Sequence, residues 1–160
     1  MLDIQSFGSA LALACGLIAI VRRKRAIGGW LFYFFCQVFI GLALLAVSTH
    51  WKYYLPREWS DPLRYFLFTL SSLSRMVLLA AVAIICIVLA ETRHAQWITA
   101  LQYALAAYAF STVLKILVDI YSFPGAASRD AMSLGFPLVW MAYFSVSERV
   151  RKVFREKTWH

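Results

Sequence analysis

The segment from Trp97 to Ser122 constrains the fold of this chain more than any other stretch. It is apolar and long enough to cross a bilayer, which takes about 20 helical residues, yet it contains Lys115 and Asp119. Its polar side chains recur every three or four residues and therefore share one helical face: Tyr108, Thr112, Lys115, Asp119 and Ser122. Because charged side chains are costly inside a membrane, we expect this face to lie against neighbouring helices.

The composition is that of an integral membrane protein. Of the 160 residues, 62% are hydrophobic and 15% are charged, whereas soluble domains have about 45–50% apolar and about 25% charged residues. The net charge is +8, but the basic residues stand in short blocks between apolar segments, as the positive-inside rule predicts. We therefore expect the lipid bilayer as a partner, and no nucleic acid.

Five apolar segments predict an all-α bundle of five transmembrane helices. They cover residues 4–21, 27–48, 63–91, 97–122 and 132–146. On this division, 1–26 form an N-terminal helix with a basic inner loop, 27–148 a four-helix membrane core, and 149–160 a basic cytoplasmic tail. The third segment is longer than one span needs, so it is either tilted or begins with an interfacial stretch that ends near Ser72.

Basic residues predict the orientation of the chain. Ten lie at the predicted inner ends, against four in or beside the outer loops. The inner ones are Arg22, Arg23, Lys24, Arg25, Arg93, Arg149, Arg151, Lys152, Arg155 and Lys157. This asymmetry predicts an N-out, C-in protein of a cell inner membrane whose basic blocks contact anionic lipid. In the tail, Val150 and Phe154 lie four residues apart, which predicts a short amphipathic helix on the membrane surface.

Two features favour contacts between helices. Gly8, Ala12 and Gly16 recur four residues apart in the first segment, and such a small-residue face permits the close approach of another helix. Gln37 is the one strongly polar residue inside the second segment. A buried amide in a membrane helix is predicted to form a hydrogen bond with a neighbouring helix.

Motifs for catalysis or for metal binding are absent from the sequence. Cys15, Cys36 and Cys86 lie in apolar segments and lack the spacing of a metal site or of a disulfide framework. The chain has no glycine-rich phosphate loop, no zinc-protease motif and no nucleophile elbow. We expect no metal and no cofactor, and an enzymatic function has no motif to support it.

Arg75 is predicted to join the polar face of 97–122. It lies 16 residues from Glu91 and Lys115 lies 18 residues from Trp97, which places the two cations about 24 and 27 Å from the inner ends of their helices. Asp119 is one turn further. Two interpretations stay open: the three groups neutralise each other as a packing device, or they form a site for an anion, an ion or a proton.

Several motifs carry a resemblance to a known family. They are IGGWL at 27–31, Val118-Asp119 late in a predicted span, and WMAYFSVSERVRKVF at 140–154. From Arg25 onward the chain resembles the small bacterial inner-membrane proteins catalogued as domain of unknown function 2569. The resemblance implies a four-helix membrane core and a bacterial inner membrane, and it implies no activity. The span before Gly28 and the acidic Glu148 depart from the family pattern.

Two functions from different classes are consistent with these features. The first is a non-enzymatic accessory or assembly subunit that packs against other integral membrane proteins, in a hetero-complex or a homo-oligomer. The alternative is a small transporter or ligand-binding membrane protein that uses Arg75, Lys115 and Asp119, with Tyr108 and Thr112 beside them, as its polar site.

Overall fold

The structure is a computed structural model that describes residues 14, 15, 17, 18, 21, 29–48, 55, 60–122 and 131–155. The regular structure of these residues is entirely helical, which confirms the predicted all-α class. The elements are α2 (Trp30–Ser48), α3 (Pro62–Thr92), α4 (Ala95–Ser122), α6 (Gly135–Val146), α7 (Glu148–Val150) and the π-helix η4 (Arg151–Arg155). The small-residue face of Gly8, Ala12 and Gly16 lies outside the described residues, as does the block from Arg22 to Arg25.

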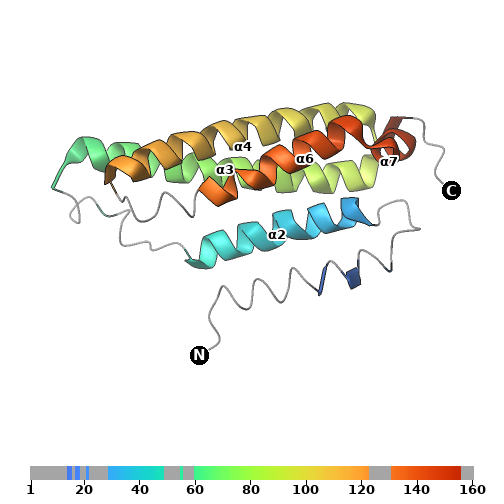
Figure 1. Ribbon diagram of the computed structural model, residues 1–160, viewed down its shortest axis with the longest axis horizontal. Coiled ribbons are helices and arrows are strands. Elements are labelled where there is room, and N and C mark those ends of the chain that lie inside the picture. Colours follow the sequence, from blue (N-terminus) through green and yellow to red (C-terminus); the bar gives the residue numbers. More distant parts are fainter. Residues whose placement is uncertain are drawn as a thin grey trace.

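Four helices lie side by side and alternate in direction along the chain (Figure 1). The α3–α4 pair has the most extensive contact, and α4–α6 and α2–α3 are the next closest pairs. One end of this bundle holds Pro62 and the other holds Arg93, and we call them the Pro62 end and the Arg93 end. Between α3 and α4 the chain turns back at Arg93, whose positive φ of 54° places it in the left-handed region that ends a helix.

The two central helices are long and apolar enough to cross a membrane. With 31 residues in α3 and 28 in α4, they are about 46 and 42 Å long. The side chain of Asp61 caps α3 by accepting hydrogen bonds from the first backbone N–H groups, and Pro62 occupies the first turn, where no N–H is needed. The helix runs without interruption across Ser72, so no separate interfacial stretch precedes it.

Aromatic side chains fill the space between α2 and α6. The ring of Phe34 lies 4.9 Å from Trp140, 5.0 Å from Phe144 and 6.1 Å from Phe136, measured between centroids. Gln37 Oε1 accepts a 2.9 Å hydrogen bond from Trp140 Nε1. This contact confirms the interhelical hydrogen bond predicted for Gln37 and joins α2 to α6 across the aromatic layer.

Pro137 lies in the first turn of α6 and does not interrupt it. The first-turn N–H groups of a helix have no intrahelical acceptor, so a proline there removes no hydrogen bond. Residues 131–133 form a separate helical turn before α6. The predicted segment 132–146 is therefore helical, but its regular part is the shorter α6.

The C-terminal segment corrects one expectation. Val150, Val153 and Phe154 are buried in the same core cluster as the bundle helices, with 2%, 3% and 1% of their surface exposed. The apolar side of α7 and η4 thus packs on the Arg93 end of the bundle, against α4, and not on a membrane surface. The physical reason is that the apolar side chains of the tail are removed from water when they join the core cluster of the bundle.

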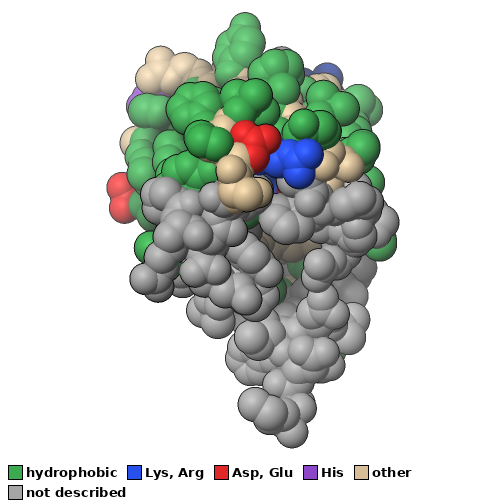
Figure 2. Space-filling view, turned by 90° about the vertical axis from the view of Figure 1, so that its left-hand side faces the viewer, with side chains coloured by type: hydrophobic (Ala, Val, Ile, Leu, Met, Phe, Trp, Pro, Cys, Tyr) green, Lys and Arg blue, Asp and Glu red, His purple; other side chains and the backbone are tan. Residues whose placement is uncertain are grey.

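Much of the described exterior is apolar. Figure 2 shows the Pro62 end, where hydrophobic side chains dominate the described part and an acidic group lies beside a basic group. Along the helices, the exposed large apolar side chains include Phe66, Val77, Ile84, Tyr103, Phe110, Leu117 and Val139. A soluble monomer rarely exposes apolar side chains in such number.

Candidate functional site

The polar face predicted for α4 is buried in the bundle. Tyr108 is 6% exposed, Thr112 0%, Lys115 9% and Asp119 1%. The side chain of Ser122, the last predicted member, lies outside the described residues. These side chains share one face because of the 3.6-residue period, and that face is turned toward α3 and α6, while the exposed face of α4 is mainly apolar.

Lys115 and Asp119 form an ion pair one helical turn apart on α4. The ammonium group of Lys115 also lies 4.9 Å from the ring centre of Phe68 on α3, within cation–π range. A buried charge needs a partner of opposite sign, because desolvation would otherwise cost several kcal/mol, of the order of 5. The pair therefore allows α4 to bury two charges at the α3–α4 interface.

Arg75 connects α3 to the segment that precedes α6. Its Nη2 donates a 3.2 Å hydrogen bond to Ser133 Oγ, and its guanidinium carbon lies 6.0 Å from the ring centre of Tyr108. The side chain is 8% exposed. Ser133 was not predicted as a site residue, because a single serine beside a predicted loop carries no periodic signal.

A hydrogen bond of 2.7 Å between the hydroxyls of Ser74 and Ser111 fixes the register of α3 against α4. Lys115 is one turn beyond Ser111 toward the Pro62 end, whereas Arg75 is one residue beyond Ser74 toward the Arg93 end. At 1.5 Å per residue, the backbone levels of Arg75 and Lys115 differ by about 7 Å. The cations thus occupy adjacent layers of one polar cluster, which we call the α3–α4 cluster: Ser74, Arg75, Tyr108, Ser111, Thr112, Lys115, Asp119 and Ser133.

The hydroxyls around these layers bond mainly to their own helices. Thr112 Oγ1 donates to Tyr108 O at 2.8 Å and Ser71 Oγ donates to Phe68 O at 3.0 Å. Such bonds satisfy the hydroxyls locally and leave little hydrogen-bonding capacity for a ligand. The chemistry available in the α3–α4 cluster is therefore that of its two cations and one carboxylate.

A second feature is a groove between α2 and α6, which we call the α2–α6 groove. Its volume is about 530 Å³ and it is open on one side. It is lined by Trp30, Tyr33, Gln37, Gly135, Phe136, Val139, Trp140 and Tyr143. Apart from the Gln37 amide and the Trp and Tyr polar atoms, these walls are apolar, so the groove suits an apolar occupant that also forms a hydrogen bond.

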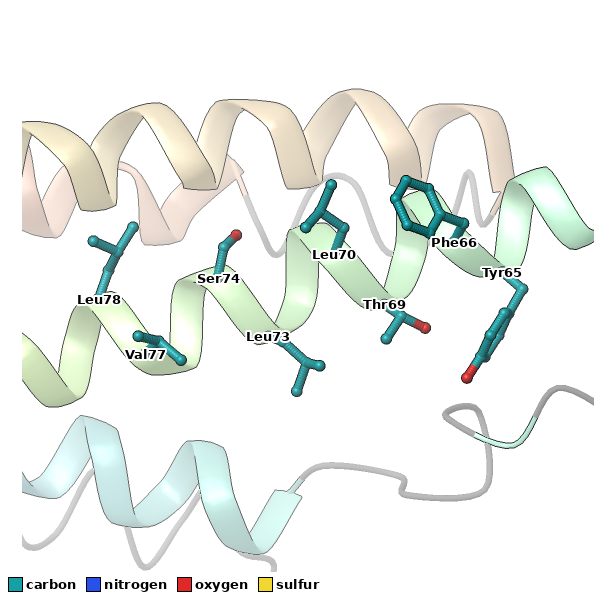
Figure 3. Close-up of a pocket in the computed structure, with 8 residues that line it drawn as sticks. All are labelled: Tyr65, Phe66, Thr69, Leu70, Leu73, Ser74, Val77 and Leu78. Carbon is teal, nitrogen blue, oxygen red and sulfur yellow. The ribbon is translucent and has the colours of Figure 1, made fainter.

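A further hollow runs along α3 alone and has a volume of about 520 Å³. In Figure 3, Tyr65, Thr69 and Leu73 point to the side of α3 on which α2 lies, and Ser74 points the other way. All eight lining residues come from this one helix. With no second element and no charged group in its walls, the hollow has no means of selecting a ligand.

Metal ligands are not gathered in the described part of the chain, where no group of three His, Cys, Asp or Glu side chains could hold an ion. Cys15 and Cys36 are free, partly buried thiols, and Cys86 is a buried free thiol in α3. Of the basic residues predicted at the membrane surface, Arg151 and Lys152 are exposed on η4, while the side chain of Arg149 lies outside the described residues.

Comparison with known proteins gives no match to a family model, to a curated protein or to a solved structure. The resemblance to the domain of unknown function 2569 family therefore stays a prediction that rests on the sequence motifs alone.

Proposed function

We propose that this chain is a non-enzymatic integral membrane protein that acts as an accessory or assembly subunit of a larger membrane complex. It would cross a bacterial inner membrane five times, with the N-terminus outside and the C-terminus inside, and its partners would be other integral membrane proteins. The proposal combines the apolar exterior of the bundle with the charge distribution of the loops.

One observation carries this proposal: the α2–α6 groove opens on the apolar exterior and holds a polar amide. The charged side chains of the α3–α4 cluster, in contrast, are buried and engage one another and their neighbours. The buried charges therefore contribute to the packing of the protein itself. The outward-facing groove is aromatic, and such a surface is suited to binding a neighbouring protein in the membrane.

Purification from native membranes in mild detergent tests the proposal. We expect a tagged chain to co-purify with a defined set of integral membrane proteins at constant stoichiometry, as measured by quantitative mass spectrometry. Recovery of the chain alone, as a stable monomer or a symmetric homo-oligomer in every detergent tried, would contradict an accessory role in a hetero-complex.

A small transporter or ligand-binding membrane protein is the second candidate. It is favoured by the burial of Arg75, Lys115 and Asp119 at one helix interface, since ionisable groups inside membrane segments often mark ion or proton pathways. Reconstituted vesicles would then show proton or chloride flux that Asp119→Asn and Lys115→Ala abolish. Equal flux in wild-type and variant vesicles would exclude this candidate.

A further inference from the structure

We propose that the α2–α6 groove receives one transmembrane helix of another polypeptide, which places a hydrogen-bond acceptor, from a hydroxyl or amide side chain, against Gln37. The inference rests on the proposed accessory role and specifies where the partner binds.

The hydrogen bond from Trp140 fixes the orientation of the Gln37 amide. An indole N–H can only donate, so the atom 2.9 Å from it must be the oxygen of the amide, and Nε2 is the other terminus. Among the described residues, none accepts a hydrogen bond from Nε2. Gln37 lines the groove, so an occupant with an oxygen acceptor would satisfy the amide hydrogens.

The walls of the groove allow a helix to approach closely. Trp30 and Val139 are exposed at its rim, at 67% and 63%. Gly135 also lines the groove, and an added Cβ there would have no atom within 4 Å. A glycine beside large apolar side chains leaves space on the surface of a helix. The side chains of a neighbouring helix can pack into that space.

The short length of α6 favours a protein occupant over lipid. Together with the helical turn before it, α6 belongs to an apolar helix from Ala131 to Val146, which extends about 24 Å against a hydrocarbon thickness of about 30 Å. In contrast, α3 and α4 are long enough to span it. Lipid beside α6 would have to thin, and contact with another helix relieves that mismatch. The groove is also open along one side and not closed around a small molecule.

Site-specific photo-crosslinking in native membranes tests the inference. Benzoylphenylalanine at Val139 reports on the groove, and the same probe at Leu117, on the exposed face of α4, is the control. We expect the Val139 probe to label one peptide, identified by mass spectrometry as a transmembrane helix containing a Ser, Thr, Asn or Gln. The Leu117 probe should not label it.

Matched substitutions test the contact itself. Gly135→Leu fills the groove from a position with free space, and Ala107→Leu adds the same side chain to the exposed face of α4. We expect Gly135→Leu and Gln37→Met each to lower the captured partner about tenfold, and Ala107→Leu to leave it unchanged. Val139→Trp provides a second way to fill the groove should Gly135→Leu fail to fold, and it should lower capture similarly.

The outcomes separate this inference from the proposed function. Crosslinking of Val139 to phospholipid, to a quinone or to a second copy of this chain would overturn the inference. So would undiminished capture by the folded Gly135→Leu or Val139→Trp variant. If the complex still co-purifies in those cases, the accessory role stands and only the groove assignment fails. If nothing co-purifies with the wild-type chain, both fail.

Discussion

At the scale of single residues, the Lys115–Asp119 pair shows how α4 tolerates charge. The two side chains are one turn apart on the same helix, so each meets its partner before any tertiary contact forms. Burial then surrounds the pair with apolar groups and the Phe68 ring, where water no longer screens the charges. The stability of the protein should consequently fall more when one member of the pair is removed than when both are removed.

Asp119→Ala should destabilise the protein by about 3 kcal/mol, because it leaves the ammonium of Lys115 buried without its carboxylate. The double variant Lys115→Met/Asp119→Leu should recover most of this loss, since it replaces both charges by apolar side chains of similar volume. Thermal unfolding in detergent measures both effects. A single variant as stable as the wild type would contradict a structural role for the pair.

At the scale of elements, the C-terminal segment behaves as a cap on the bundle. Ser147 separates α6 from α7, and its side-chain oxygen accepts a hydrogen bond from Val150 N as an N-cap. The chain changes direction there, and α7 and η4 return to α4. Buried Val150, Val153 and Phe154 hold this cap in place.

Phe154→Ala should therefore cost about 3 kcal/mol of stability, because it opens a cavity at the Arg93 end. Lys152→Ala is the matched control: its side chain is exposed on the same π-helix, so the change should stay within about 0.5 kcal/mol. Unfolding by heat or denaturant compares the two variants. If the two variants are equally stable, the packing of the tail on the bundle is contradicted, and the position on the membrane surface predicted from the sequence is favoured.

The contact between the first predicted segment and α2 can be tested through their cysteines. Because the side chains of Cys15 and Cys36 lie near each other, mild oxidation of a Cys86→Ser variant should join them in an intramolecular disulfide. Mass spectrometry of the digested protein would identify the linked peptides, and Cys36→Ser is the control. A failure to link would place the first segment elsewhere on the bundle.

At the scale of the whole molecule, two long helices, α3 and α4, lie beside two shorter helices, α2 and α6. The α3–α4 hairpin carries the buried polar cluster, and α2 and α6 flank it with aromatic side chains. This difference in length gives the bundle one side, α3 and α4, that is long and apolar enough to cross a membrane, and a second side, α2 and α6, that is shorter. The proposed partner site lies on the second side.

Five crossings predict that the two chain ends lie on opposite sides of the membrane. A single cysteine added before Leu2, in a variant that lacks the three native cysteines, should react with a membrane-impermeant reagent applied outside. A cysteine added after His160 should react only after permeabilisation. Labelling of both ends from one side would contradict the proposed topology, whatever the arrangement of the bundle core.

Local patterns in the sequence determined the helices and the buried face of α4. Helical periodicity acts over a few residues, so it predicted the polar face that includes Thr112 and Asp119, and the two apolar segments 63–91 and 97–122. Gln37 was predictable as a hydrogen-bonding residue for the same reason. Its partner, Trp140, was not, because the pairing depends on which helices become neighbours.

Only the tertiary structure decided the contacts between segments far apart in the chain. Ser133 meets Arg75, and the tail binds the bundle and not the membrane surface. An apolar face on a short helix has the same pattern whether it is covered by lipid or by protein. Which of the two covers it depends on the free energy of packing in the assembled bundle, and that is a property of the whole molecule.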